Sequence, residues 1–146
     1  MATKITSDEE IKTIEKALNS KYSTCNICID KATKLLFDRE KPDYENSIKE
    51  SISSIEAICN IINDGKKTTL NKALEKLKDS GIIIHPAMIE SFISLYGYTS
   101  DQSGIRHNTG IGNKATYEEA KYMLIVCSAF MNYLIELNEQ MNEKNG

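Results

Sequence analysis

The sequence predicts an all-α protein, an antiparallel bundle of four to five helices with one long polar loop before the last helix. Apolar residues recur at steps of three and four along most of the chain, which is the spacing of one buried helical face. Gly and Pro number only seven and two in 146 residues, whereas an all-β fold needs many turns. Two capping boxes of the type Ser/Thr-x-x-Glu mark helix starts.

The first helical segment opens at the capping box of Ser7 and Glu10, and its apolar stripe runs from Ile11 to Leu36. The pair Asn19-Ser20 softens this long segment in its middle. A short connection follows, and the second helix begins near Asp43.

Glycines and a proline mark the ends of the next helices. Asn63-Asp64-Gly65 ends the second helix, with Gly65 as its left-handed cap, and Gly81 terminates a third helix from about Thr69 to Ser80. After the extended bridge 82–85, Pro86 opens the fourth helix, which stops at Gly97.

A long polar loop is expected from Tyr98 to Ala115, and loops of this length are often functional. The last helix opens at the capping box of Thr116 and Glu119. It is apolar on nearly every face from 123 to 134, which predicts the central helix of the bundle. We expect one domain over 1–146, frayed at 1–6 and 138–146.

The net charge of −3 excludes nucleic-acid binding through an overall positive charge. Any nucleic-acid binding therefore needs a local basic patch or a groove between two subunits. Met1–Glu10 lacks the apolar core of a secretory signal, and the apolar run Tyr122–Met131 is half the length of a membrane span. We therefore expect a cytoplasmic protein, without a membrane segment, whose cysteines are reduced.

Cys25 and Cys28 form a Cys-x-x-Cys pair on or near the apolar stripe. A zinc site needs four ligands, and Cys59 and Cys127 are far away in sequence on other predicted helices. The interpretation is small buried hydrophobic residues, with no metal and no cofactor. His85, next to Pro86, is read as a half-buried ring that caps the fourth helix.

Three lysines are candidate RNA phosphate ligands. Lys66 and Lys67 begin a basic stretch that ends at Ser80, and Lys114 lies in the long loop. The alternative for the basic stretch is an ordinary solvated face.

Arg106-His107 is the most specific feature, because one of two arginines adjoins one of two histidines inside the loop. A histidine can move a proton to or from an RNA hydroxyl, and an arginine can hold a phosphate. Asp101 is a candidate orienting group. The alternative is structural, with Arg106 paired to Asp101 or to a glutamate and His107 capping a turn.

Six stretches carry a family resemblance: Pro42–Tyr44, Asn46–Ile52, Tyr96–Asp101, Gly104–His107, Glu119–Leu124 and Cys127–Ala129 with Phe130. As a set they resemble the C-terminal HEPN-like domain of bacterial abortive-infection proteins, over about Ile11 to Leu134. The resemblance implies a HEPN-type bundle, usually a homodimer, with the polar motif near the interface. In this group the domain often ends a longer polypeptide, so a fused or separate defence-system domain is an expected partner.

Active members of the wider HEPN group are metal-independent endoribonucleases that use an arginine and, four to six residues further on, a histidine. Arg106 matches the arginine, but positions 111–113 are Ile, Gly and Asn. Two readings follow. In the first, an antiphage endoribonuclease uses His107 as acid or base and Arg106 as phosphate clamp. In the second, a non-catalytic dimerisation or RNA-binding module acts as sensor or regulator.

Overall fold

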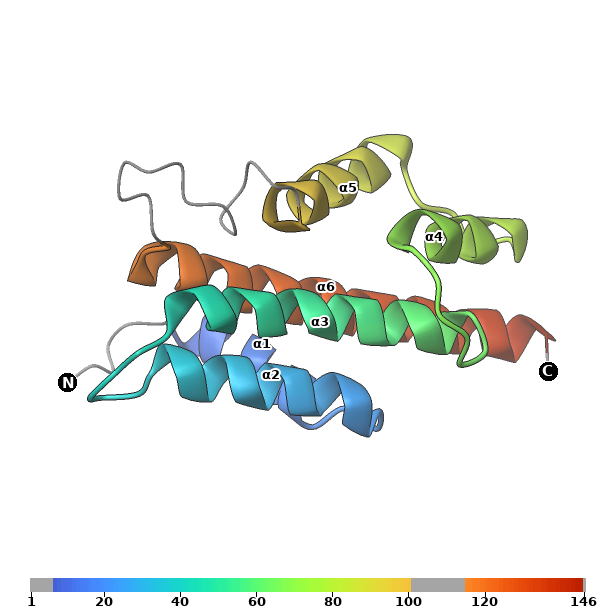
Figure 1. Cartoon of the computed structure of the whole chain (residues 1–146). Helices are drawn as coiled ribbons and strands as arrows, with labels where there is room; N and C mark the ends of the chain where they lie inside the picture. The colour runs from blue at the N-terminus through green and yellow to red at the C-terminus, as the bar shows by residue number, and fades with distance from the viewer. Residues whose placement is uncertain (1–6, 101–114, 146) are drawn as a thin grey trace.

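The computed structural model describes residues 7–100 and 115–145, with side chains to 97 in the first range. These residues form six α-helices and no strand (Figure 1), so the all-α bundle is confirmed. The helices are α1 (Asp8–Leu18), α2 (Ser23–Leu36), α3 (Tyr44–Ile62), α4 (Leu70–Asp79), α5 (Pro86–Ser100) and α6 (Tyr117–Asn145).

The extra helix arises because the first predicted segment is two helices, α1 and α2. Asn19 ends α1, since its side-chain amide donates to the carbonyl of Glu15 at 2.9 Å and competes with the helical pattern. Asn26 then donates to the carbonyl of Ser20 at 2.8 Å and fixes the turn. The pair Asn19-Ser20 therefore breaks the helix rather than softening it.

The predicted helix caps are confirmed. Ser7 and Glu10 exchange bonds of 3.2 and 2.9 Å, and Thr116 and Glu119 exchange bonds of 3.1 and 3.0 Å. Each pair satisfies two backbone N–H groups that the first turn leaves without partners. Gly65, at φ 85°, lies in the left-handed region as expected.

Helix α2 runs antiparallel to α3, but the antiparallel arrangement predicted for the whole bundle is not found throughout it. Helix α2 opposes α3, since Ser47 near the start of α3 donates to the carbonyl of Ala32 late in α2 at 2.8 Å. Helices α1, α3 and α6 run in one direction. Thus Lys16 late in α1 pairs with Glu136 late in α6, and the rings of Tyr44 and Tyr117 meet at the starts of α3 and α6.

Helices α4 and α5 lie between α3 and α6 in the sequence and cover one side of the bundle, and α5 ends over the middle of the bundle (Figure 1). Helix α5 rests on the bundle through few but large contacts. Phe92 stacks on Phe130 with ring centroids 3.8 Å apart, and the Tyr96 hydroxyl donates to Glu56 at 2.8 Å. Helix α5 continues past Gly97 to Ser100, so the stop predicted at Gly97 is wrong.

Helix α6 is the central helix, as predicted, and contacts α1, α2, α3 and α4. It is also the one helix in the described residues that is long and apolar enough to cross a membrane by length and composition. However, 56% of its most apolar 18-residue window is buried inside the bundle. A helix that is apolar on most faces is expected at the centre of a protein core.

The polar tail from Asn138 is helical to Asn145, so the predicted fraying is wrong for this stretch. Tertiary contacts explain the difference. The Asn138 amide donates to the Tyr22 hydroxyl at 3.1 Å, and Met141 is buried in the core. Residues 1–6 lie outside the described part of the chain, as does the 101–114 part of the predicted loop.

Truncation of a central core residue should destabilise the fold strongly. Ile58 on α3 is fully buried, whereas Ile83 between α4 and α5 is 92% exposed. We expect Ile58→Ala to lower the free energy of unfolding by about 3 kcal/mol, from lost burial plus a cavity. Ile83→Ala should change it by less than about 0.5 kcal/mol. Urea denaturation followed by circular dichroism measures both, and similar losses would contradict this core.

Candidate functional site

Four of the predicted site residues, Asp101, Arg106, His107 and Lys114, lie outside the residues that the structure describes. The chain on either side is described. It leaves α5 after Ser100 and is described again from Ala115, which is 9% exposed and precedes α6. The surroundings of Ala115 are therefore the described part of the candidate site.

The start of α6 lies beside the starts of α1 and α3, because these three helices run in the same direction (Figure 1). Helix N-termini carry partial positive charge and attract anions. Here carboxylates already occupy the first turns. They are Asp8, Glu9 and Glu10 on α1, Glu45 on α3, and Glu118 and Glu119 on α6. The described surface around Ala115 is consequently acidic.

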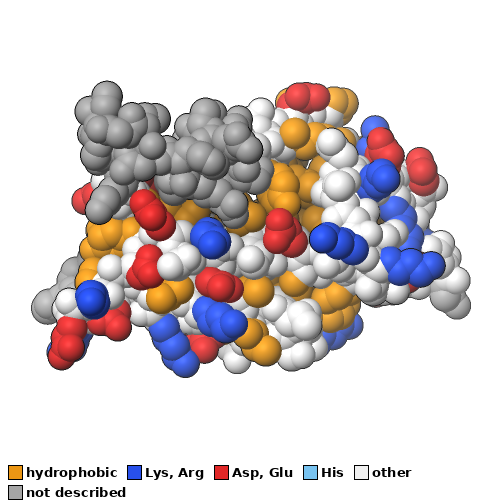
Figure 2. All heavy atoms as spheres, in the orientation of Figure 1, with side chains coloured by type: hydrophobic (Ala, Val, Ile, Leu, Met, Phe, Trp, Pro, Cys, Tyr) orange, Lys and Arg blue, Asp and Glu red, His pale blue; other side chains and the backbone are white. Residues whose placement is uncertain are grey.

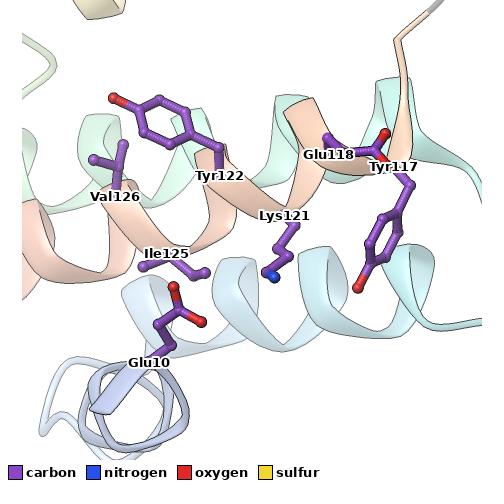
Figure 3. Close-up of a pocket in the computed structure, with 7 residues that line it drawn as sticks. All are labelled: Glu10, Tyr117, Glu118, Lys121, Tyr122, Ile125 and Val126. Carbon is purple, nitrogen blue, oxygen red and sulfur yellow. The ribbon is translucent and has the colours of Figure 1, made fainter. Parts of the chain in front are cut away.

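A hollow of about 540 Å³ lies between the first turn of α1 and the first three turns of α6 (Figure 3). Its lining combines a lysine and two glutamates with apolar groups. Figure 3 shows Glu10, Lys121 and Ile125 on the side toward α1, and Tyr122 and Val126 projecting from the opposite side of α6. A hollow with this lining suits a mixed polar and apolar partner better than a bare phosphate.

Tyr117 closes the end of this hollow. Its ring packs edge-on against Tyr44 with centroids 6.0 Å apart. Its hydroxyl is buried and has no hydrogen-bond partner within the described part of the chain. Burial raises the pKa of Tyr117, so the phenol is protonated at neutral pH and keeps a proton to donate.

A second hollow of about 400 Å³ joins Ala115 to the connection between α2 and α3. Pro42, Asp43 and Tyr44 line it, and Lys41 is its cation. Asp43 is held firmly, because it caps α3 by accepting from the N–H and the side-chain amide of Asn46 at 3.1 and 2.7 Å. Sequence reasoning included these residues in the family resemblance but did not place them at the site.

Lys66 and Lys67 lie at the opposite end of the bundle, exposed in the loop between α3 and α4. Helix α3 has 19 residues and is therefore about 28 Å long. The structure does not bring these lysines together with Ala115. Lysine side chains gather over α4, away from the start of α6 (Figure 2), and Lys76 there pairs with Asp64 at 2.9 Å.

Three of the four cysteines are buried, so the interpretation as buried hydrophobic residues is confirmed for Cys25 but only in part for Cys28. Cys25, Cys59 and Cys127 are at most 2% exposed, and burial raises the pKa of each to about 12. Cys28 is half-buried, and burial also raises its pKa. In the described residues no group of three or more His, Cys, Asp and Glu side chains is placed to hold a metal ion.

His85 caps α5, as the sequence predicted. Its Nδ1 accepts the backbone N–H of Ala87 at 3.0 Å, which satisfies a group in the first turn. The residue is exposed rather than half-buried. His85 therefore has a structural role, and His107 remains the candidate histidine for the site.

The thiols should react only where water reaches them. At pH 8, raised pKa values leave Cys25, Cys59 and Cys127 protonated, and the thiolate is the reactive form. We expect Ellman's reagent to modify Cys28 alone in the native protein and all four thiols in guanidinium chloride. The Cys28→Ser variant should be silent until unfolded, and fast labelling of that variant would contradict this arrangement.

No protein-family model, no curated protein and no solved structure matches this chain. The resemblance carried by the six sequence stretches therefore stays a prediction.

Proposed function

We propose that this chain is a HEPN-like domain of bacterial antiphage defence that cleaves RNA without a metal ion, using Arg106 and His107. One observation carries the proposal. Pro42–Tyr44, a stretch of the resemblance far away in sequence, shares a hollow with Ala115, where the segment containing Arg106 and His107 rejoins the described chain.

In the proposed reaction the RNA's own 2′-hydroxyl oxygen attacks the adjacent phosphorus. The phosphorus–O5′ bond breaks, leaving a cyclic phosphate and a 5′-hydroxyl. His107 either takes the proton from the 2′-hydroxyl, with water protonating the leaving O5′, or protonates O5′, with water taking the proton of the 2′-hydroxyl, and Arg106 holds the charge that gathers on the phosphate oxygens. Asp101 orients the cationic pair. No cofactor is required, because the nucleophile belongs to the substrate.

The acidic surroundings favour a short contact with RNA. Glu10, Glu118 and Glu45 repel a phosphate chain laid across the surface, whereas Arg106 can neutralise a single phosphate. The absence of a histidine at positions 111–113 favours a second candidate, a non-catalytic HEPN-like module that dimerises or binds RNA as sensor or regulator. In either case we propose a cytoplasmic homodimer that works with a fused or separate defence-system domain.

Substitution of the two site residues should abolish cleavage, and the chain supplies matched controls because it has one other arginine and one other histidine. We expect wild type to cut total RNA in EDTA. Arg106→Gln and His107→Asn should each lower the rate by at least about 100-fold, the usual contribution of a general acid or base. Arg39→Gln and His85→Asn should leave the rate unchanged, since asparagine keeps a cap acceptor at 85.

Two different results would count against the cleavage proposal, and the assay tells them apart. If wild type binds RNA but does not cut it, the second candidate is favoured. If cleavage persists in His107→Asn, the nuclease is a contaminant or its site lies elsewhere, and the assignment to Arg106 and His107 is wrong. Denaturing gels with end-labelled RNA distinguish these cases.

The lysines at the far end should matter only for long RNA. Lys66 and Lys67 lie about one helix length from the start of α3, and a tetranucleotide is too short to reach both ends of the bundle. The double change Lys66→Glu and Lys67→Glu should weaken binding of a long RNA in low salt but leave tetranucleotide cleavage unchanged. Fluorescence anisotropy and cleavage assays check this, and equal loss for both substrates would contradict the separation.

A further inference from the structure

The hollow between α1 and α6 brings complementary polar groups together beside an apolar floor. Figure 3 shows the Lys121 ammonium and the Tyr117 hydroxyl on the side of α6 from which Glu10 approaches, with Ile125 next to the Glu10 carboxylate. The volume of about 540 Å³ is in the range of sites for small organic molecules. The proposed cleavage of RNA uses none of these groups.

Glu10 is a carboxylate that the fold holds in place while one of its oxygens stays unused. Its Oε1 accepts the backbone N–H of Ser7 at 2.9 Å in the capping box of α1, so the side chain is fixed. Its Oε2 accepts no hydrogen bond within the described part of the chain, although the residue is half-buried. A half-buried anion with an unused oxygen is a binding point for an ammonium group.

Two hydrogen-bond donors line the same hollow. Lys121 is half-buried, and its ammonium group has three N–H donors, so it can hold a ligand carboxylate in addition to the interaction that it already makes. The Tyr117 hydroxyl is buried and has no acceptor among the described residues. A buried donor without a partner destabilises the free protein, and an acceptor on a ligand would supply the missing hydrogen bond.

We propose that this hollow binds a small zwitterion, a free amino acid with an apolar side chain. The ligand's ammonium group donates to Oε2 of Glu10, and its carboxylate accepts from Lys121 and from the Tyr117 hydroxyl. Its side chain lies on Ile125, beside the ring of Tyr122, which is 57% exposed at the rim. This binding site goes beyond the proposed cleavage of RNA and does not depend on it.

Other small ligands leave a charge of the hollow unmatched. A simple anion is repelled by the carboxylate of Glu10, and a simple amine is repelled by the ammonium of Lys121. An uncharged apolar molecule would cover both groups without pairing either of them. Glu118 is exposed at the rim, where water solvates its charge. A zwitterion is therefore the ligand class that pairs both half-buried charges.

The first test compares ligands on the intact chain by NMR titration of its backbone amide signals. L-leucine and L-phenylalanine are the probes, and we expect at least one of them to bind with a Kd below about 1 mM. The amide of that amino acid lacks the carboxylate, and its N-acetyl form lacks the ammonium group. Each should bind at least about tenfold more weakly than the parent. If neither amino acid binds below that limit, or if an analogue binds as tightly as its parent, the proposal is overturned.

The second test locates the site with variants that keep the fold. Glu10→Gln removes the charge but keeps the helix cap, because glutamine also completes a capping box. Tyr117→Phe removes only a hydroxyl that has no partner to lose, so the free variant should be at least as stable to urea as wild type.

Each of these two variants should weaken amino acid binding at least about tenfold. The matched controls Glu9→Gln and Tyr133→Phe change the same residue types outside this hollow and should bind as wild type does. Unchanged binding in Glu10→Gln or Tyr117→Phe, or an equal loss in the controls, would overturn the assignment of the site.

Discussion

Helix α6 must bury most of its surface, and this requirement arranges the rest of the molecule. Its core residues Leu124, Met131 and Leu134 are fully buried, and it packs most heavily against α3 and α1, which run in its own direction. Because α3 and α6 are parallel, the chain must return along the bundle between them. Helices α4 and α5 and the segment 101–114 lie between the two in the sequence, and the described chain resumes at Ala115 beside the start of α3.

Small side chains let α3 pack closely in the core. Ser47, Ser51 and Ser54 on α3 and Ser128 on α6 are fully buried. Ser47 donates to the carbonyl of Ala32, and Ser54 to that of Ser51 at 2.6 Å, so both keep a hydrogen bond inside the core. This packing holds the starts of α3 and α6 in a fixed relation, and the hollow between Asp43 and Ala115 lies between them.

Local chemistry explains what the sequence predicted well. Capping boxes, positive-φ glycines and a proline in the first turn act within a few residues, so they located helix ends at Ser7, Gly65 and Pro86. A long-range contact explains one of the errors. The tail after Asn138 is polar in sequence, but Tyr22 and the core hold it in the helix. Gly97 signals a stop, yet α5 continues to Ser100.

For the candidate site, too, the sequence identified residues by their local chemistry but not their arrangement in space. Rarity and chemistry singled out Arg106 and His107, and basic composition singled out Lys66 and Lys67. Whether such residues share a site depends on helix direction, which residue spacing does not determine. The parallel pairing of α3 and α6 places Lys66 and Lys67 a helix length away from Ala115, and places Pro42–Tyr44 beside it.

If an RNA phosphate binds at His107, as proposed, the two histidines of the chain allow a direct measurement. The imidazole proton signals are followed by NMR while a 2′-O-methylated tetranucleotide, which cannot be cleaved, is added, and His85→Asn assigns the two signals. We expect the His107 signals to shift and the pKa of His107 to rise near the phosphate, while the His85 signals stay fixed. Unchanged His107 signals at saturating RNA, or a shift confined to His85, would contradict it.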